Sequence, residues 1–434
     1  MVSIGIIGLG TVGSGTVKTL VKNREIIEKR LGFPLFIKKI ASLEYDRSFE
    51  RLFPSNTITR DAEELFKEKL DIVVELIGGI DKAKEYILKA IENGSSVVTA
   101  NKALLSTHGF EIFKKAYEKK VDVGFEASVG GGIPIIRAIK EGLCANNILS
   151  IKGIVNGTAN YILTSMLEEG KTFQEILKRA QDLGFAEKDP SLDIDGIDSA
   201  HKTAILASLA FGTVLTAQEV YTEGIRGIEY SDLEYARRLG YKVKLLGIVK
   251  MKGGKIDARV HPAMIRETDT LAKVDGVYNA ITVKGDVVED TTYIGQGAGS
   301  FPTASSVVSD IMDVSRNIYY KTHLRIPLLS FPFQHIRKLP TIDINSLSMK
   351  YYLRFRVIDS VGVLAKIANV LGNHGISIKS VIQLGHGKEW VPVVLMTHRA
   401  REKDVKKAVE IVDKLDVVRD KTLLIRVEED EDVG

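Results

Sequence analysis

The chain has 434 residues, more than one ordinary domain holds, so two or three domains are expected. An apolar fraction of 44% is enough for sizeable cores, and a net charge of only +4 gives no sign of a nucleic-acid or membrane partner. No apolar run reaches membrane-spanning length, and the first residues form a strand pattern instead of a signal peptide. Cys144 is the only cysteine, which excludes an intramolecular disulfide and favours a reducing compartment, the cytoplasm.

The first third of the chain alternates short apolar runs with helical patterns. Strands are predicted at residues 4–7, 72–76, 96–99 and 121–125, and helices at residues 81–92 and 107–119. This alternation predicts a Rossmann-type doubly wound parallel sheet, and the fold class is therefore α/β. We place this first domain at residues 1–132.

The middle third changes character, because its helices come first and its strands follow. Helical patterns cover residues 160–169, 172–183 and 197–211, and strand patterns cover residues 243–251 and 256–260. Such grouping predicts an α+β domain, which we place at residues 133–300. A helix within residues 301–320 then returns to the first domain.

The last part begins with a linker, expected at residues 321–348 because proline recurs there and periodicity is weak. Beyond it, strands are predicted at residues 350–358, 376–384, 391–397 and 422–427, and helices at residues 361–374 and 402–415. This βαββαβ order predicts a ferredoxin-like domain at residues 349–434. The acidic end, residues 428–432, is expected to be frayed.

A glycine-rich turn follows the first strand directly and opens a helix. Its residues are Gly8, Leu9, Gly10, Thr11, Val12 and Gly13. The first glycine permits a tight turn, the second lets the backbone approach a pyrophosphate, and the third lets helix and strand pack closely. Since the helix N-terminus also offers free N–H groups, this position favours dinucleotide binding over a merely tight turn. Gly78, after the strand at residues 72–76, is a further cofactor-binding candidate.

The choice between NAD and NADP stays open in the sequence. The second strand is expected to end near residues 40–43, where a carboxylate would favour NAD and an arginine NADP. Glu44 and Arg47 both lie close to that end, and Lys38 and Lys39 precede it.

Residues 180–202 concentrate acidic side chains near two lysines. Asp198 and Lys202 are four residues apart at the start of a predicted helix, so they share one face. Taken alone, this pattern is typical of a helix entry capped by acids, with a surface ion pair.

The same segment resembles the signature of the homoserine dehydrogenase family. The matching positions are Ala180, Gly184, Phe185, Ala186, Asp189, Pro190, Asp193, Ile194, Gly196, Asp198 and Lys202. The resemblance covers about residues 1–320 and implies the NAD(P)-dependent interconversion of L-homoserine and L-aspartate 4-semialdehyde, in threonine, methionine and isoleucine biosynthesis. No kinase-like segment precedes the first strand, so the monofunctional form is expected.

Oxidation of an alcohol requires removal of the hydroxyl proton while hydride leaves. The sequence shows no His/Cys cluster of the kind that binds zinc, and a lysine of lowered pKa can serve instead. The resemblance assigns this role to Lys202 and makes Lys102 a second active-site lysine near nicotinamide and substrate. How the two divide the acid and base roles is left open.

The resemblance also implies contacts to the substrate. Glu187 should hold the ammonium of homoserine, and Asp198 should bind its reacting end or position Lys202. Asp193 and Thr158, the latter facing the substrate carboxylate, are further candidates, and a purely structural role for these two is an equal alternative.

Two glycine-rich segments complete the site that the resemblance implies. Gly184 and Gly299 should lie beside the nicotinamide, although Gln296 stands where the family usually has proline, a change that could loosen the second turn. Backbone carbonyls of a second segment should hold a monovalent cation such as Na⁺, or the segment is simply a glycine hinge. The residues concerned are Glu126, Val129, Gly131 and Ile133.

Residues 359–368 and 373–378 resemble ACT domains, small modules that often bind amino acids. Asp359, Gly362 and Asn373 are the effector-binding candidates, and threonine is the expected effector. A module that only builds a homodimer or homotetramer is the alternative, and coupling is expected to run through subunit pairing and not through the linker.

Two other functions were weighed against this one. The first is another dehydrogenase of a small amino-acid-like aldehyde or alcohol, and the signature segment argues against it. The second is a non-enzymatic sensor built on an inactive dehydrogenase, and the presence of both Lys102 and Lys202 argues against that.

Overall fold

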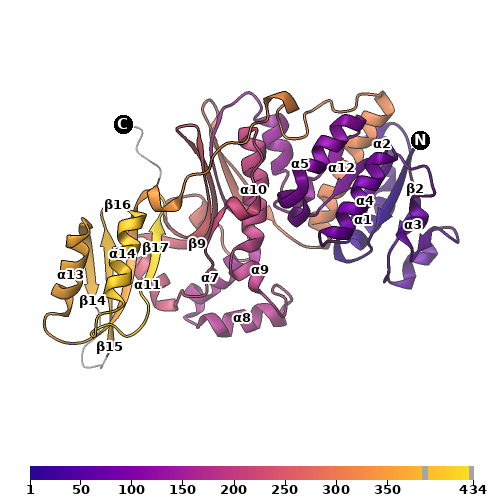
Figure 1. The fold of residues 1–434 in the computed structure, drawn as a ribbon. Coiled ribbons are helices and arrows are strands. Elements are labelled where there is room, and N and C mark those ends of the chain that lie inside the picture. The colour runs from indigo at the N-terminus through magenta and orange to yellow at the C-terminus, as the bar shows by residue number, and fades with distance from the viewer. Residues whose placement is uncertain (384–389, 430–434) are drawn as a thin grey trace.

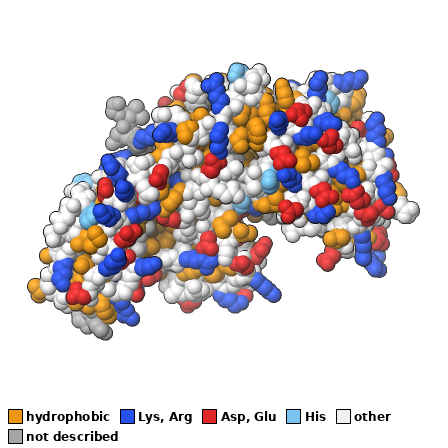
Figure 2. All heavy atoms as spheres, viewed as in Figure 1, with side chains coloured by type: hydrophobic (Ala, Val, Ile, Leu, Met, Phe, Trp, Pro, Cys, Tyr) orange, Lys and Arg blue, Asp and Glu red, His pale blue; other side chains and the backbone are white. Residues whose placement is uncertain are grey.

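The structure is a computed structural model that describes residues 1–383 and 390–429 (Figure 1). Three parts follow one another across the view, with the N-terminal domain on the right and the C-terminal domain on the left. Over the face shown in Figure 2, basic and acidic side chains are interspersed. In the described part of the chain, no helix has both the length and the apolar character needed to cross a bilayer.

The N-terminal domain is a six-stranded parallel sheet in the order β3-β2-β1-β4-β5-β6. Its strands are β1 (Val2–Ile7), β2 (Leu35–Ala41), β3 (Ile58–Thr59), β4 (Ile72–Glu75), β5 (Ser96–Thr99) and β6 (Val123–Gly124). The strand order reverses between β1 and β4, which is where a doubly wound sheet binds its ligand. The predicted Rossmann-type fold is confirmed.

Helices cover both faces of this sheet, and both faces are therefore apolar. The helices of this domain are α1 (Thr11–Lys22), α2 (Arg24–Leu31), α3 (Ala62–Leu65), α4 (Asp81–Glu92), α5 (Lys102–Lys119) and α12 (Ser300–Tyr320). Ile4 and Ile6 of β1 belong to one buried cluster with α1 and α12, and Ile7 belongs to the cluster that includes α4 and α5. The predicted return helix is thus present as α12, packed against α1.

The middle domain is an antiparallel sheet covered by helices. Its strands follow the order β12-β11-β7-β9-β10, and their bounds are β7 (Ile148–Ile154), β9 (Tyr241–Lys252), β10 (Lys255–Arg266), β11 (Tyr278–Gly285) and β12 (Glu289–Gln296). A short strand, β8 (Tyr221–Thr222), pairs with β10. The helices are α6 (Ile135–Arg137), α7 (Gly157–Glu169), α8 (Phe173–Asp182), α9 (Ser191–Ile194), α10 (Ile197–Phe211) and α11 (Tyr230–Arg238).

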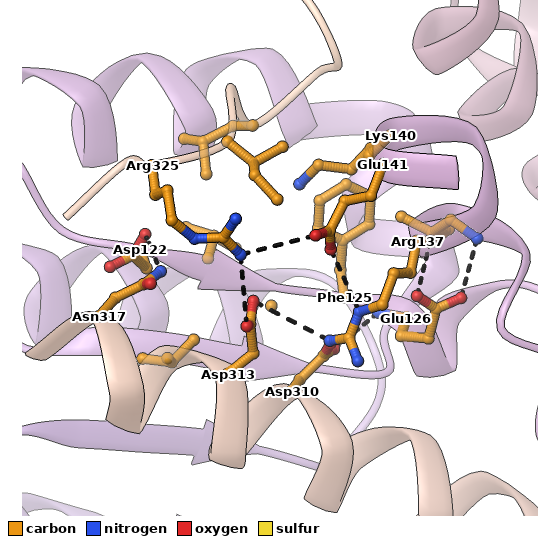
Figure 3. Close-up of a pocket in the computed structure, with 16 residues that line it drawn as sticks. Asp122, Phe125, Glu126, Arg137, Lys140, Glu141, Asp310, Asp313, Asn317 and Arg325 are labelled. Carbon is orange, nitrogen blue, oxygen red and sulfur yellow. Dashed lines mark hydrogen bonds and ion pairs between the residues drawn. The ribbon is translucent and has the colours of Figure 1, made fainter. Parts of the chain in front are cut away.

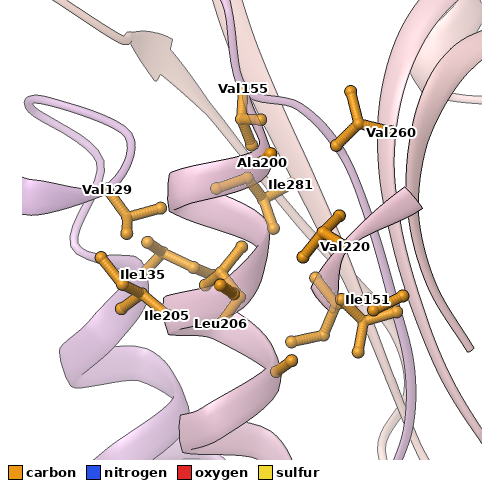
Figure 4. Close-up of a cluster of buried hydrophobic side chains, with 14 of the residues drawn as sticks. Val129, Ile135, Ile151, Val155, Ala200, Ile205, Leu206, Val220, Val260 and Ile281 are labelled. Atoms are coloured by element: carbon orange, nitrogen blue, oxygen red, sulfur yellow. The ribbon is translucent and has the colours of Figure 1, made fainter. Parts of the chain in front are cut away.

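Helix α10 lies at the centre of this domain. Figure 4 shows Ala200, Ile205 and Leu206 of this helix between side chains of the sheet, such as Ile151 and Val260, and Ile135 of α6. The helix also packs against α5 of the first domain. Groups on α5 and α10 can therefore meet between the two domains.

The C-terminal domain has the predicted ferredoxin-like order. It consists of β13 (Ser348–Ile358), α13 (Val363–Asn373), β14 (Ile378–Gln383), β15 (Trp390–Thr397), β16 (Ala400–Arg401), α14 (Glu402–Val412) and β17 (Leu423–Val427). Its main strands follow the order β17-β13-β15-β14.

Strand β17 also pairs with β10, in parallel, so the middle and C-terminal domains share one eleven-stranded sheet. The pairing continues past β17, because Glu428 N donates to the Met264 carbonyl at 2.9 Å. Glu428 is buried and forms an ion pair with Arg259 at 3.0 Å. The prediction of a frayed end is therefore wrong at residues 428 and 429, whereas residues 430–432 lie outside the described part of the chain.

The segment between α12 and β13 packs on the catalytic part of the chain. Leu328 and Leu329 are buried, and the ring of Phe333 stacks on that of Tyr117, with 5.0 Å between centroids. Farther along, Ile342 N donates to the Ile256 carbonyl at 2.8 Å, next to the start of β10. The linker predicted from the sequence thus follows the surface of two domains before it enters the third.

A candidate active site between two domains

Two lysines from different domains meet at one carboxylate. Lys102 is the first residue of α5, and Asp198 and Lys202 lie one turn apart at the start of α10. Lys102 Nζ is 2.9 Å from Asp198 Oδ1, and Lys202 Nζ is 2.8 Å from Asp198 Oδ2. The predicted pairing of Asp198 and Lys202 on one helix face is therefore present, and it is buried, not a surface ion pair.

The environments of the two lysines differ. Burial lowers the pKa of Lys202, Asp198 opposes this, and the ammonium of Lys102 lowers it further. Asp198, in contrast, raises the pKa of the more exposed Lys102. Burial alone would raise the pKa of Asp198, but the two ammonium groups outweigh it and hold that pKa well below its usual range. Lys202 is therefore the lysine that releases a proton more readily.

Asn156 orients the acidic groups. Its side-chain oxygen accepts from Ala159 N at 2.8 Å and so caps α7. Its Nδ2 donates to Asp193 Oδ1 at 2.7 Å and to Asp198 Oδ2 at 2.9 Å. Asp193, whose pKa is raised by burial, thus reaches the site through Asn156. Sequence reasoning did not single out this side chain, although asparagine before an apolar helix is a capping signal.

The turn at residues 183–189 lies over the start of α7. Thr158 Oγ1 donates to the Phe185 carbonyl at 2.7 Å, and the Phe185 ring lies 5.1 Å from that of Tyr161. Gly184 has a φ of +75° and is exposed. Glu187 is exposed too, and its carboxylate lies close enough to Lys102 to contribute to the raised pKa of that lysine, after Asp198 and Asp193.

The glycine turn after β1 has the geometry that phosphate binding needs. Gly8 has a φ of +102°, and a Cβ atom on Gly13 would lie 2.0 Å from the Gly8 carbonyl oxygen. A Cβ on Gly10 would meet no described heavy atom within 4 Å, so the backbone there is open to a ligand. Gly10 caps α1 without a side-chain hydrogen bond, which leaves the N–H groups of Thr11 and Val12 directed toward that space.

Two other glycine turns lie near the same edge of the sheet. Gly78 follows β4 with a φ of +73°, and the buried Glu75 carboxylate accepts from its N–H at 3.3 Å. Gly299, with a φ of +116°, caps α12. The next residue, Ser300, donates to the Thr11 carbonyl at 2.7 Å and so joins this turn to the first one.

Asn279 of β11 lies between two of the turns that line the site. A Cβ on Gly297 would be 2.0 Å from the Asn279 amide, and a Cβ on Gly157 would be 3.6 Å from its Oδ1. The amide is buried, and neither its nitrogen nor its oxygen has a hydrogen-bond partner among the described residues. A buried amide is rarely left unsatisfied, so Asn279 is an added candidate for the site that no sequence pattern marked.

The candidate cation-binding carbonyls lie in one buried loop. The Gly131 carbonyl accepts from Ser306 Oγ at 2.7 Å and the Ile133 carbonyl from Ile135 N at 2.8 Å, which leaves each oxygen a second lone pair. The Glu126 carboxylate accepts from Ile136 N and Arg137 N, so only its backbone oxygen could face a cation. These residues fit a weakly held monovalent cation bound through backbone oxygens.

Beside this loop lies a buried cluster of charged side chains (Figure 3). Asp310 Oδ2 accepts from Glu126 N at 2.7 Å, and Arg137 Nη2 lies 3.5 Å from Asp310 Oδ1. Burial and the carboxylate of Glu126 raise the pKa of Asp310 to about 7. The cluster ties α12 to the loop that connects the first two domains.

Comparisons with known proteins bear on this site. Residues 8–126 match the model for the NAD-binding domain of homoserine dehydrogenase, residues 134–312 match that for homoserine dehydrogenase, and residues 351–417 match an ACT domain. The chain is 45% identical to a homoserine dehydrogenase of Pseudomonas aeruginosa over 99% of both chains. The chain belongs to the homoserine dehydrogenase family.

Solved structures agree with this assignment. The crystal structure of a homoserine dehydrogenase from Thiobacillus denitrificans superposes with a TM-score of 0.92 at 44% identity, covering 99% of this chain and 98% of the other. A hyperthermophilic archaeal homoserine dehydrogenase in complex with NADPH gives a TM-score of 0.62 at 29% identity, over 72% of this chain and 97% of the other. As a homoserine dehydrogenase, the chain is an oxidoreductase with a nicotinamide cofactor.

The ACT domain of this homoserine dehydrogenase separates the predicted effector residues. Asp359 and Gly362 precede α13, and Gly362 adopts a φ of +86° as its cap. Asn373 is the last residue of the same helix. A helix of eleven residues is about 16 Å long, so one small amino acid cannot contact both ends of it within a single chain.

Proposed function

We propose that this chain interconverts L-homoserine and L-aspartate 4-semialdehyde by the chemistry of Lys102, Asp198 and Lys202. The observation that carries the proposal is the meeting of two lysines from different domains at one buried carboxylate. The turn after β1 and the start of α7, the proposed cofactor and substrate sites, belong to the same two domains that supply these lysines.

In the oxidation direction, neutral Lys202 takes the proton of the homoserine hydroxyl. A bound nicotinamide would supply the hydride acceptor for the carbon that carries this hydroxyl. Lys102 stays charged and stabilises the oxygen as negative charge develops on it, and Asp198 holds both amino groups. In the reverse direction, the ammonium of Lys202 returns its proton to the aldehyde oxygen as hydride arrives at the carbon.

Glu187 is proposed to bind the substrate ammonium. We expect Glu187→Gln to raise the KM for homoserine by about 10- to 100-fold, because a charge-assisted hydrogen bond is worth about 1.5–3 kcal/mol. The KM for the cofactor should change little, since Glu187 lies on the turn over α7 and not near α1. Steady-state kinetics test this. Glu169→Gln is the control, because the Glu169 carboxylate at the end of α7 binds Arg179 of α8. An unchanged KM for homoserine in a folded Glu187→Gln variant would remove this role.

NADP is the proposed cofactor. The residue after β2, where an NAD enzyme carries its ribose-binding carboxylate, is Ser42, whose Oγ accepts from Leu9 N at 3.1 Å. Arg60 directly follows β3, and Thr59 of β3 pairs with Ala41, the last residue of β2. Arg60 and Ser42 therefore leave the sheet at the same edge. The archaeal relative solved with NADPH supports the proposal.

The decisive experiment is a steady-state assay of homoserine oxidation with NADP⁺ and with NAD⁺. We expect turnover with a higher kcat/KM for NADP⁺, and Arg60→Ala should reduce that preference by about tenfold, the effect of one lost charge contact. Absence of turnover with either cofactor would refute the proposed function, whereas a preference for NAD⁺ would refute only the cofactor proposal.

Regulation is proposed to need a second subunit. The effector candidates lie at opposite ends of α13, with Asp359 and Gly362 before its start and Asn373 at its end. One threonine can therefore contact both ends only if one ACT domain supplies Asp359 and Gly362 and a second one supplies Asn373. Strand β14 ends the described sheet and offers an edge for such pairing in a homodimer or homotetramer. Threonine added to the assay should inhibit, and sedimentation should show more than one chain; a monomer that threonine inhibits would contradict the shared site.

Two further proposals concern a bound cation and the cellular location. The monovalent cation at the 126–133 loop is supported by the free lone pairs described above, and replacement of Na⁺ by a bulky organic cation in the same assay tests it. The reducing location inferred from Cys144 stays a prediction.

A further inference from the structure

A short segment after β8 connects the ACT domain to the catalytic helices. On the ACT side, Arg426 of β17 is fully buried and donates to both oxygens of Glu223, at 2.6 and 2.9 Å. The same guanidinium donates through Nε to Glu402 of α14 at 3.0 Å. Arg426 of the ACT domain therefore binds one carboxylate of the middle domain, Glu223, and one of its own domain, Glu402.

Tyr221 closes this network. Its hydroxyl accepts from Arg426 Nη2 at 3.1 Å and from Lys406 Nζ at 3.0 Å, and it donates to Glu223. Burial would raise the pKa of Glu223, but its partners, above all Arg426, lower it to about 2. This carboxylate is therefore charged at assay pH. The contacts are charge-assisted and bidentate, which fixes the geometry of Glu223.

On the catalytic side, the residues after Glu223 lie directly against the turn between α9 and α10. Ile225 N donates to the Ile194 carbonyl at 2.8 Å. A Cβ on Gly224 would lie 2.2 Å from the Ile194 oxygen and 2.5 Å from Asp195 Cα, so only glycine permits this approach. The turn itself includes Gly196, which has a φ of +82° and caps α10.

This turn spaces the acidic residues of the site. Asp193 precedes it and Asp198 follows it, and both accept from the one side-chain nitrogen of Asn156. A Cβ on Gly196 would lie 3.1 Å from the Thr222 methyl and 3.2 Å from the Glu223 carbonyl oxygen. A shift of the Glu223 backbone would therefore press on the turn that spaces Asp193 and Asp198.

We infer that Glu223 and Arg426 are positioning residues for the proposed reaction: their ion pair holds the turn between α9 and α10, so the ACT domain is part of the active-site scaffold. The inference rests on the proposed function. The proposed route lies within one chain. It runs from Arg426 through Glu223 to the turn that spaces Asp193 and Asp198.

The chain offers a matched control for this contact. Arg356 of β13 also joins the ACT domain to the middle domain, because its Nη2 donates to both oxygens of Glu229 at 3.0 Å. Glu229 caps α11, a helix that begins after the β8 segment and carries none of the catalytic groups. Loss of the Arg356 contact weakens docking without touching the turn.

The experiment compares Glu223→Gln with Arg356→Gln in the full chain. We expect Glu223→Gln to lower kcat for homoserine by about 10- to 100-fold, the effect of a misplacement of about 1 Å at a catalytic centre, with an unchanged KM for NADP⁺. Arg356→Gln should keep the wild-type kcat. Tyr221→Phe is a milder change that should also lower kcat. It replaces Glu223→Gln in the comparison if that variant folds poorly.

A double-mutant cycle with Asp193→Asn separates positioning from a general loss of stability. If Glu223 acts through the turn, its effect on kcat should largely disappear in the Asp193→Asn background, whereas independent effects multiply. An unchanged kcat in both Glu223→Gln and Tyr221→Phe would overturn the inference, as would multiplicative effects or an equal loss in Arg356→Gln. A wild-type chain that does not oxidise homoserine would instead refute the proposed function.

Discussion

Replacement of Lys202 by alanine should lower the turnover of homoserine by about 10²–10⁴-fold, the usual contribution of a positioned acid or base. Lys202 is the buried lysine whose pKa burial lowers, so it supplies the neutral amine that takes the hydroxyl proton. Asp198 keeps Lys102 as its partner at 2.9 Å, and the variant therefore retains a compensated carboxylate and should fold. Cofactor binding should persist, because the turn after β1 lies in the other domain.

Lys244 provides a matched control. It is also buried, burial lowers its pKa, and it donates to Asn160 at 2.9 Å and to Asp275 at 2.8 Å, away from the catalytic carboxylate. Lys244→Met should keep kcat even if it melts at a lower temperature. Turnover and cofactor fluorescence titration check both variants; a folded Lys202→Ala protein with near-wild-type kcat would show that another group moves the proton.

Asp198→Asn should have the largest effect on stability, a loss of about 3–5 kcal/mol in the free energy of unfolding near neutral pH. Lys202 is buried, and in the variant its amino group keeps only the Val155 carbonyl at 2.6 Å and the new amide. Turnover should fall as well, because neither lysine is then held in place.

The pH dependence of this loss has a definite sign. Without the carboxylate, the pKa of Lys202 in the folded variant falls still further below its ordinary value, so the unfolded chain binds more protons than the folded one. Stability of the variant relative to wild type must then rise with pH, up to the lowered pKa of Lys202 in the wild-type fold. Urea denaturation over a series of pH values below the ordinary lysine pKa of about 10.4 measures it. A deficit that is equal at all of these pH values would mean that Lys202 carries the same charge in the variant as in wild type.

The two lysines differ in burial and in their place on a helix. Both contact the same carboxylate, Lys102 from the first residue of α5 and Lys202 from within α10. The part of Lys102 that faces solvent lets it keep its charge, whereas Lys202 is buried where α10 packs against the sheet. The acid and base roles that the sequence left open are thus proposed from this difference in burial.

Much of the fold was determined by the sequence itself, because its signals are local. The alternation of apolar runs and helical periods predicted the doubly wound sheet, and the bounds expected for α4 and α10 agree with those observed. The glycine turn at residues 8–13 and the βαββαβ order of the last domain were equally evident. Each of these patterns is produced within one short segment, by the repeat of a helix or strand or by the backbone freedom of glycine.

What only the tertiary structure decided depends on segments far apart in the chain. Strands β7, β11 and β12 were not predicted; β12 is largely polar, and its hydrogen bonds go to β11. The candidate Asn279 was missed too, because its closeness to Gly157 and Gly297 appears only in the folded chain.

The joining of the middle and C-terminal sheets is the clearest case. Arg426 and Glu223 are 203 residues apart, and each looks like an ordinary surface charge in its own part of the sequence. They meet, with Arg426 buried and Glu223 beside the turn between α9 and α10, because β17 pairs with β10. The local sequence pattern of a strand does not predict which distant strand it will pair with. The sequence thus indicated the chemistry of the site and the elements that carry it, whereas long-range strand pairing alone brings the ACT domain into contact with Glu223, beside the turn between α9 and α10.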